Sequence, residues 1–366
     1  MRRLEQLHDA GVSIWLDSLS RDLLESGKFR ELIDEFGVSG ATSNPTIFAK
    51  AISGSSRYDE QLRGLISAGG DADPQKLFFE LALQDVRQAA QMLEPIHERS
   101  GGRDGFISFE CTPDLADDAE ATVAQALALW RGLDSANVLI KVPATPAGVR
   151  AIEELTAAGV NVNVTLLFSV QRYEEVIEAY LRGLERRLAQ GEPIDGIRSV
   201  ASFFVSRVDA KADAALAEGS SLRGRVAIAN AHMAYRRYEA RFSGERWEAL
   251  AAAGATAQRP LWASTGTKDP NYSDVRYVER LIARDVINTM PEDTLRAFAD
   301  HGEIDRGHGP EVETPDAVLE AAAREGVDLD AITEQLEREG VEAFCDSLQE
   351  LLECIETKVG SLSVAH

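Results

Sequence analysis

The sequence predicts an α/β fold, a closed (β/α)8 barrel with extra helices after the sixth strand and at the C-terminal end. Two observations carry this prediction. Short runs rich in β-branched and aromatic residues alternate with longer segments of helical periodicity, which is typical of parallel βαβ units. Eight such runs occur in the 366 residues, and eight βα units close into a barrel of ~250 residues plus insertions.

The eight predicted strands lie far enough apart for a helix to fit between most of them. They span residues 12–16, 38–43, 105–110, 137–142, 160–167, 199–205, 260–264 and 285–289. Between them, apolar residues recur at helical spacing, most clearly over residues 77–91, 117–130 and 170–189. The regular alternation supports right-handed crossovers in a single parallel sheet.

Two segments exceed a minimal barrel. Residues 207–257 are helical and rich in Ala, Arg and Glu, which indicates additional helices after the sixth strand. Residues 314–362 are also helical in pattern, and we expect them to pack on the barrel or on a partner subunit. Because no low-complexity linker or internal repeat interrupts the chain, we expect residues 1–366 to form a single domain.

The chain is strongly acidic, with 38 basic and 61 acidic residues and a formal net charge of −23. Such a charge should repel nucleic acid and anionic membranes, so any anionic substrate needs local basic residues. The three cysteines (Cys111, Cys345 and Cys354) make no disulfide framework. The opening residues MRRLEQLHDAG lack the apolar core of a signal peptide, and no run approaches the ~18 apolar residues of a membrane span. We therefore expect a cytoplasmic protein without nucleic-acid or membrane partners.

The clearest sign of a functional site is the stretch VNVNVTLL, residues 160–167. Side chains alternate between the two faces of a strand, so Asn161, Asn163 and Thr165 share one face. A strand of a parallel sheet that is covered on both faces should be almost continuously apolar. The polar face therefore favours a site, although a solvent-facing edge strand would show the same alternation.

Polar residues recur at the carboxyl ends of several predicted strands, this one included. They are Asp17, Asn44, Glu110, Lys141, Asn163 with Thr165, and Ser202 with Phe204 and Arg207. Catalytic groups of (β/α)8 enzymes come from the carboxyl ends of several strands. Lys141 is the most telling of them, because burying an ammonium group is costly and a lysine without its extra proton is a nucleophile.

Each of these residues also has a purely structural explanation. Lys141 could extend its ammonium group to water from the end of its strand. Asp17 or Asn44 could cap a helix or form a turn, Glu110 could be a surface carboxylate, and Arg207 a solvated basic residue. It is their occurrence together, in order along the chain, that favours an active site.

Several of these segments together resemble transaldolase, specifically the longer bacterial type. The matching segments are IWLDSLSR, GATSNPTIFAKAI, SFE, NVLIKVPATPAG, GVNVNVTLLFS, SFFVSRVD, LWASTGTKDP and VINTMPEDTL. They extend from about residue 17 to about residue 302. The resemblance implies a class I aldolase mechanism in a (β/α)8 barrel, without metal or other cofactor.

The resemblance assigns the catalytic residues. Lys141 matches the lysine that forms a Schiff base with the donor. Asp17 matches the acid/base that removes the proton of the C4 hydroxyl. Glu110, through a water molecule, assists proton transfer at the amine and the C2 oxygen, and Thr165 holds that water.

The resemblance also assigns substrate contacts. Asn44 and Asn163 would hold the hydroxyl groups of the dihydroxyacetone unit. Arg207 matches the phosphate-binding arginine, with Ser202 as a further donor to the phosphate. Phe204 would shape the donor pocket, or serve packing alone.

Lys268, in STGTKDP, stands where we expect a second phosphate-binding cation. Shorter family members carry an arginine nearby, so this position departs from their pattern. The six histidines are scattered without metal-ligand spacing, and we expect no metal site.

The implied reaction belongs to the non-oxidative pentose phosphate pathway. A dihydroxyacetone unit would pass from sedoheptulose 7-phosphate or fructose 6-phosphate to glyceraldehyde 3-phosphate or erythrose 4-phosphate. Two alternatives stay open at this point. The chain could be a Schiff-base aldolase that cleaves without transfer, or a catalytically silent barrel that binds sugar phosphates. The sequence leaves monomer and homodimer equally open.

Overall fold

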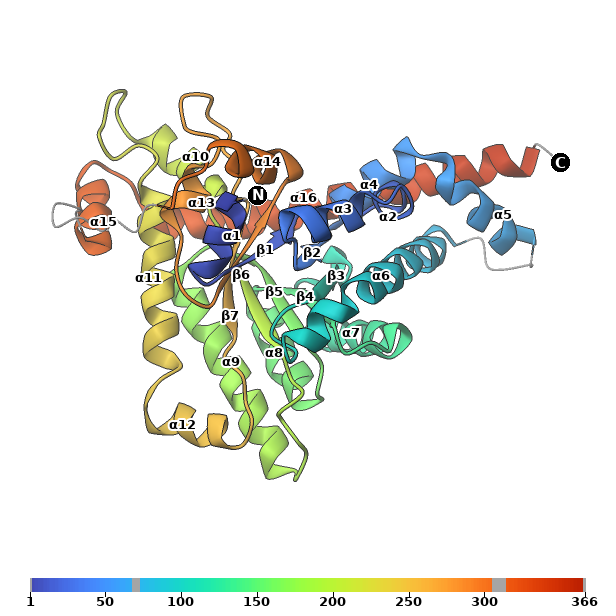
Figure 1. The fold of residues 1–366 in the computed structure, drawn as a ribbon, viewed down its shortest axis with the longest axis horizontal. Helices are drawn as coiled ribbons and strands as arrows, with labels where there is room; N and C mark the ends of the chain where they lie inside the picture. Colours follow the sequence, from blue (N-terminus) through green and yellow to red (C-terminus); the bar gives the residue numbers. More distant parts are fainter. Residues whose placement is uncertain (1, 68–72, 305–313, 365–366) are drawn as a thin grey trace.

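A computed structural model describes residues 2–67, 73–304 and 314–364. Eight parallel strands form a closed barrel in which each strand pairs with the next in sequence and β8 pairs with β1 (Figure 1). The strands are β1 Val12–Leu16, β2 Gly40–Thr42, β3 Phe106–Glu110, β4 Val138–Pro143, β5 Val162–Leu167, β6 Ser199–Phe204, β7 Arg259–Ala263 and β8 Val286–Met290. The predicted (β/α)8 barrel is confirmed.

Helices connect and surround the strands. They are α1 Arg2–Asp9, α2 Arg21–Glu25, α3 Lys28–Phe36, α4 Pro45–Gly54, α5 Asp59–Ser67, α6 Pro74–Arg99, α7 Ala119–Leu133, α8 Pro146–Ala157, α9 Val170–Ala189, α10 Ser206–Ala215, α11 Val226–Arg241, α12 Gly244–Ala252, α13 Arg276–Arg280, α14 Glu292–His301, α15 Pro315–Arg324 and α16 Leu329–Val364, with short 3-10 turns η1 Ser56–Tyr58 and η2 Pro113–Leu115. The predicted helices over residues 77–91, 117–130 and 170–189 correspond to α6, α7 and α9. Helices α10, α11 and α12 account for the predicted helical segment after the sixth strand.

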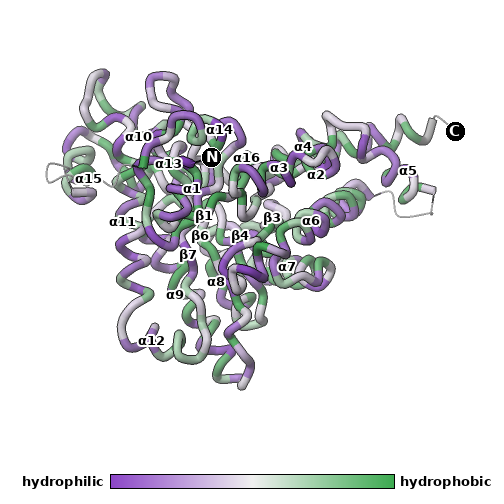
Figure 2. The backbone as a smooth tube through the Cα atoms, in the orientation of Figure 1, coloured by the Kyte–Doolittle hydropathy of each residue, from purple (hydrophilic) through white to green (hydrophobic). Residues whose placement is uncertain are grey.

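Hydrophobic residues of the strands and of the helices around them form one buried core, and hydrophobic stretches run through the strands at the centre of Figure 2. At β2 the packing between strands is especially close. A Cβ atom at Gly40 would lie 2.5 Å from Cε2 of Trp15, whose ring is fully buried on the adjoining β1. The Trp15 indole donates to Oδ1 of Asp104 at 2.7 Å. Any side chain at Gly40 would therefore displace a buried aromatic ring that is also held by a hydrogen bond.

The long helix α16 crosses the carboxyl ends of several strands. It packs against α4, η2 and α10, which directly follow β2, β3 and β6, and against β5 itself. Figure 1 shows α16 running beside α4 toward the C-terminus. Leu348 of α16 lines a small cavity together with Asn44 and Glu110. The predicted C-terminal helices thus pack on the barrel, at the end where polar strand-end residues gather.

A buried ion pair braces the connection after β1. Arg21, at the start of α2, forms a 2.8 Å ion pair with Asp85 of α6, and both side chains are almost fully buried. The Tyr58 hydroxyl donates to the other Asp85 oxygen at 2.8 Å and accepts from the Arg21 backbone N–H. Burial raises the pKa of Asp85, although the Arg21 charge opposes this effect. The network ties α2, η1 and α6 together.

Replacement of Asp85 by alanine is expected to lower the free energy of unfolding by about 3–5 kcal/mol, because Arg21 would keep a buried charge without its partner. The double variant Arg21→Met/Asp85→Ala serves as the control, since it removes both charges. Urea unfolding should show the double variant to be clearly more stable than Asp85→Ala. Equal stability of the two variants would mean that the cavity left by the shortened Asp85 side chain, and not the unpaired Arg21 charge, causes most of the loss in unfolding free energy.

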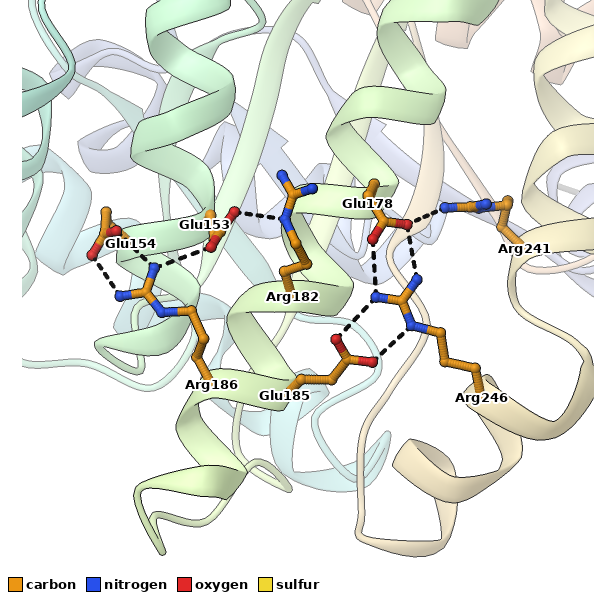
Figure 3. Close-up of polar contacts among 8 residues, drawn as sticks. All are labelled: Glu153, Glu154, Glu178, Arg182, Glu185, Arg186, Arg241 and Arg246. Carbon is orange, nitrogen blue, oxygen red and sulfur yellow. Dashed lines mark hydrogen bonds and ion pairs between the residues drawn. The ribbon is translucent and has the colours of Figure 1, made fainter.

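Exposed arginine–glutamate networks connect α8, α9, α11 and α12 on the outside of the barrel (Figure 3). Arg246 of α12 makes two hydrogen bonds to Glu178 and two to Glu185 of α9, at 2.7–3.0 Å. Arg186 similarly contacts two glutamates of α8. Exposed ion pairs contribute at most about 1 kcal/mol each, so these contacts orient the outer helices without determining the fold.

Candidate active site

The parallel register brings three predicted site residues to one level of the barrel. Glu110 on β3 lies opposite Lys141 on β4, and Lys141 lies opposite Asn163 on β5. Asp17 directly follows β1, and Arg207 is the second residue of α10, just after β6. All are at the carboxyl ends of the strands, where the sequence pattern placed them.

Lys141 is held by two acceptors inside the barrel mouth. Its Nζ donates to the backbone carbonyl of Ser43 at 2.9 Å and to Oε2 of Glu110 at 3.3 Å. The Lys141 and Glu110 side chains are each only 6% exposed. The predicted alternative of a lysine that reaches out to water is therefore wrong. Glu110 is the nearest ionisable group that can take a proton from the amine.

Burial changes the acidity of both carboxyl groups. It raises the pKa of Glu110, against the opposing effect of the nearby Lys141 charge. Burial likewise raises the pKa of Asp17, with Lys141, the Thr42 hydrogen bond and Arg207 acting in the opposite direction. Carboxyl groups with raised pKa values are suited to take up and return protons near neutral pH.

Asp17 is oriented by hydroxyl groups of the neighbouring strands. Thr42 of β2 donates to Oδ1 of Asp17 at 2.9 Å, and the Thr42 hydroxyl also contacts the Thr289 hydroxyl of β8 at 2.8 Å. The Asp17 backbone N–H donates to the carbonyl of Met290. The carboxylate is thus held by Thr42, which Thr289 contacts in turn, and the backbone of Asp17 is held by β8. None of these contacts is a helix cap made by the Asp17 side chain.

Asn44 does cap a helix, as one of the structural alternatives predicted. Its Oδ1 accepts from the backbone N–H of Ile47 at 2.9 Å, and Pro45 occupies the first position of α4. This bond uses the amide oxygen and leaves the Nδ2 group as the donor that could reach a substrate. The cap fixes the orientation of the side chain.

Asn163 belongs to a chain of hydrogen-bonded polar side chains in the barrel interior. Its Nδ2 donates to Ser108 Oγ at 2.9 Å, and its Oδ1 accepts from Ser202 Oγ at 2.7 Å. Asn163 is fully buried and Ser202 is 3% exposed. The Ser202 hydroxyl, which the sequence predicted as a phosphate donor, is used in this structure to orient Asn163.

Thr165 sits beside an irregularity in β5. The register between β5 and β6 shifts between Val164 and Leu167, and Leu166 has a left-handed φ of 54°. Such a conformation is strained for a bulky residue and re-aims the strand locally. Thr165 is fully buried, and its Oγ1 has no hydrogen-bond partner among the residues that the structure describes. A small polar molecule such as water would satisfy it.

Arg207 makes a cation–π contact with Phe204. Its guanidinium lies 5.2 Å from the centre of the Phe204 ring, which packs in turn on Phe168. Burial lowers the pKa of Arg207, against the effect of Asp17 and Glu110. Lys268 is an exposed residue on the loop after β7. Partial burial of its amine lowers the pKa of Lys268, and the Arg207 charge acts in the same direction.

The structure separates Asn161 from the site. Asn161 precedes β5, donates to the carbonyls of Ala136 and Val138, and accepts from the Arg198 backbone N–H. It therefore braces the opposite, amino-terminal ends of the strands. Sequence reasoning also missed the Ser43 carbonyl, because a backbone acceptor leaves no signal in the residue type.

The arrangement suits carbonyl chemistry. An amine beside a carboxylate can attack a carbonyl group and form an imine, and a second carboxylate nearby can move a proton at an adjoining carbon. Across residues 2–67, 73–304 and 314–364, no group of three or more His, Cys, Asp or Glu side chains could hold a metal ion. None of the helices in those ranges is long and apolar enough to cross a membrane.

Comparisons with known proteins show the family of the chain. The family model described as Transaldolase/Fructose-6-phosphate aldolase matches residues 14–355. A protein of Saccharopolyspora erythraea named transaldolase is 50% identical over 361 residues, which cover 97% of each chain. Transaldolase 1 of Streptomyces avermitilis is 49% identical over 98% of this chain and 96% of its own. A Thermobifida fusca protein named transaldolase is 47% identical over 98% of both chains.

Proposed function

Because the chain belongs to the transaldolase/fructose-6-phosphate aldolase family, as an enzyme of the transaldolase kind, we propose that it transfers a dihydroxyacetone unit through a Schiff base on Lys141. The donor is a ketose phosphate, sedoheptulose 7-phosphate or fructose 6-phosphate. The acceptor is an aldose phosphate, glyceraldehyde 3-phosphate or erythrose 4-phosphate. The observation that carries the proposal is the buried Lys141 amine within 3.3 Å of Glu110.

Imine formation starts the reaction. The Lys141 amine attacks the donor's C2 carbonyl, the C2 oxygen leaves as water, and an iminium forms. Glu110 takes and returns protons at the amine and the C2 oxygen, directly or through a water bound by Thr165. The unpartnered Thr165 hydroxyl and the raised pKa of Glu110, which burial causes, support these roles.

Carbon–carbon cleavage follows. Asp17 removes the proton of the C4 hydroxyl, C4 becomes an aldehyde carbon, and the electrons of the C3–C4 bond move toward the iminium. The aldose phosphate leaves and the three-carbon unit stays on Lys141. Addition to an acceptor aldehyde reverses the sequence, with Asp17 returning the proton.

Retention of the three-carbon unit separates transfer from plain cleavage. We assign its hydroxyl groups to the Nδ2 of Asn44 and to Asn163, which Ser108 and Ser202 hold in place. Ser202 could reach a phosphate only by giving up its bond to Asn163, so its role is to orient that residue.

The phosphate group binds to the paired cations at the edge of the barrel. Arg207 is braced by Phe204, and a planar guanidinium suits bidentate contact with phosphate. Lys268 supplies the second positive charge. Because the lysine itself provides the electron sink, the proposed reaction needs no cofactor or metal, and sugar phosphates are its substrates in the cytoplasm.

Borohydride reduction in the presence of fructose 6-phosphate tests the proposal. The hydride reduces the iminium and fixes the sugar to the protein, and peptide mapping by mass spectrometry should find a three-carbon adduct on Lys141. Transfer to erythrose 4-phosphate should then be much faster than release of free dihydroxyacetone. Rapid release without an acceptor would indicate an aldolase, and the absence of any adduct on a folded, ketose-binding protein would indicate a silent barrel.

A further inference from the structure

The loop that carries Lys268 is hydrogen-bonded at its start to helix α10. At residue 264 it leaves β7, and the Ser206 backbone N–H donates to the Ser264 carbonyl at 3.0 Å. The two serine hydroxyl groups also contact each other at 2.8 Å. Ser264 adopts a left-handed φ of 56°, which is uncommon for a residue other than glycine. The start of the loop is therefore held beside the first residue of α10.

The same loop returns to α10 four residues after Lys268. The Tyr272 hydroxyl donates to Oδ2 of Asp213 at 2.6 Å, and the backbone N–H of Gly224 donates to Oδ1 of the same carboxylate at 2.8 Å. Gly224 has a φ of 69°, and a Cβ atom there would lie 2.8 Å from Cζ of Tyr272. The close approach of the Tyr272 ring thus depends on a glycine.

Asp209 repeats this arrangement one helical turn earlier. Its carboxylate accepts from the Ala227 backbone N–H at 2.7 Å and from the Tyr277 hydroxyl at 2.9 Å. Asp209 is 1% exposed, and burial raises its pKa to about 6. Residues four apart share one face of a helix, so α10 presents two buried carboxylates that hold tyrosines of the segment after β7.

Helix α10 also carries Arg207, so the contacts that hold the loop to α10 also hold it near the Arg207 segment. The Ser206–Ser264 contacts hold the start of the Lys268 loop beside the residue that precedes Arg207. Partial burial lowers the pKa of Lys268 and the Arg207 charge adds to this effect, as expected for two like charges on neighbouring segments. A free loop would relax by moving Lys268 away. The contacts at Ser206 and Asp213 oppose that movement from both ends of the loop.

We propose that Asp213 and Tyr272 are positioning residues that hold Lys268 beside Arg207 and thereby set the affinity for phosphorylated substrates. The inference rests on the proposed function, in which Arg207 and Lys268 bind the phosphate. It adds that one helix fixes the spacing of both cations, through the guanidinium at its start and a carboxylate two turns later.

The test compares acceptors with and without phosphate. Tyr272→Phe removes only the hydroxyl, and a net hydrogen bond of this kind corresponds to a roughly three- to tenfold change in affinity. We expect KM for glyceraldehyde 3-phosphate to rise about three- to tenfold, with kcat and the KM for unphosphorylated glyceraldehyde nearly unchanged. The donor is fructose 6-phosphate at saturating concentration throughout.

Tyr277→Phe is the matched control, because it removes the equivalent hydroxyl from Asp209 outside the Lys268 loop. It should lower the melting temperature without changing the ratio of the two KM values. If Tyr272→Phe also lowers only the melting temperature, or raises both KM values equally, the tyrosine is a structural brace and the positioning role is refuted.

A double-mutant comparison separates the positioning role from the proposed function. In a Lys268→Met background, Tyr272→Phe should have no further effect on KM for the phosphorylated acceptor, because the charge it positions is gone. An undiminished effect in that background overturns the positioning role and leaves the proposed function intact. If Lys268→Met itself leaves the KM ratio unchanged, the phosphate role of Lys268 is wrong, and the positioning role fails with it.

Discussion

Replacement of Lys141 by methionine is expected to abolish borohydride-dependent labelling by fructose 6-phosphate and to lower turnover by at least about 10³-fold, since loss of a catalytic nucleophile removes the covalent route altogether. Methionine retains most of the length of the lysine side chain and lacks the amine. The buried carboxyl of Glu110, whose pKa burial raises, can take up a proton once its cationic partner is gone. The fold should therefore survive, which circular dichroism can verify.

Lys211→Met is the matched control for this experiment. Lys211 lies on α10 and pairs with Glu339 of α16 at 2.9 Å, away from the Lys141 amine. Its loss should leave both labelling and turnover close to those of the unmodified protein. Labelling that persists in Lys141→Met, on another lysine and with normal turnover, would refute the assignment of the Schiff base.

The barrel was predictable because its signal is carried by residue type. Every strand begins and ends within two residues of its predicted range. Runs of β-branched residues bounded by polar residues are a distinctive signal for strands. The largest difference is β2, predicted over 38–43 and observed as Gly40–Thr42. Asn44 caps α4 and Pro45 begins it, so the chain turns into a helix at once after Ser43.

The details of the site were less predictable, because they depend on backbone geometry and on contacts between distant residues. The Ser43 carbonyl that accepts from Lys141 could have been supplied by any residue type. The alternation of polar and apolar residues over 160–167 did not predict the left-handed backbone conformation of Leu166. It also placed Asn161 with Asn163, although the two lie at different depths in the barrel and make different contacts.

The position of α16 on the barrel also could not be predicted from the helical spacing of its residues. Helical spacing predicted that residues 314–362 are helical and left open what they cover. In the structure a Cβ atom at Gly340 would lie 2.9 Å from Cδ2 of Leu166, so α16 packs directly on the irregular part of β5. The residue next to Thr165 is thus confined by the far end of the chain, a contact between residues about 170 positions apart that periodicity does not encode.

Replacement of Asp17 by asparagine is expected to slow turnover by about 10²–10⁴-fold, the usual contribution of a general acid or base, while imine formation on Lys141 survives. Asparagine has the same shape and keeps an oxygen that can accept the Thr42 hydroxyl. It cannot take the proton of the C4 hydroxyl. The donor should therefore bind, condense with Lys141 and stop before the C3–C4 bond breaks.

Mass spectrometry after borohydride reduction shows directly whether the reaction stops before the C3–C4 bond breaks. The unmodified protein incubated with fructose 6-phosphate should carry the three-carbon adduct, whereas Asp17→Asn should carry mainly the intact six-carbon sugar phosphate. Glu110→Gln is the comparison variant, because loss of that carboxylate should slow the appearance of any adduct without enriching the six-carbon form. Both side chains lie near Lys141, so the two variants distinguish proton transfer at C4 from proton transfer at the amine.

The pH dependence gives a second, independent signature of Asp17. Burial raises the pKa of this carboxyl, against the effects of Lys141, Thr42 and Arg207, and the group must be ionised to act as a base. In single-turnover cleavage, the rate should fall on the acidic side at a pH above the ordinary aspartate pKa of ~3.9. In Asp17→Asn, the residual rate should lose this acidic limb. A limb that persists unchanged, together with three-carbon adducts formed at the unmodified rate, would move the C4 proton transfer to Glu110, the other carboxylate within reach of Lys141.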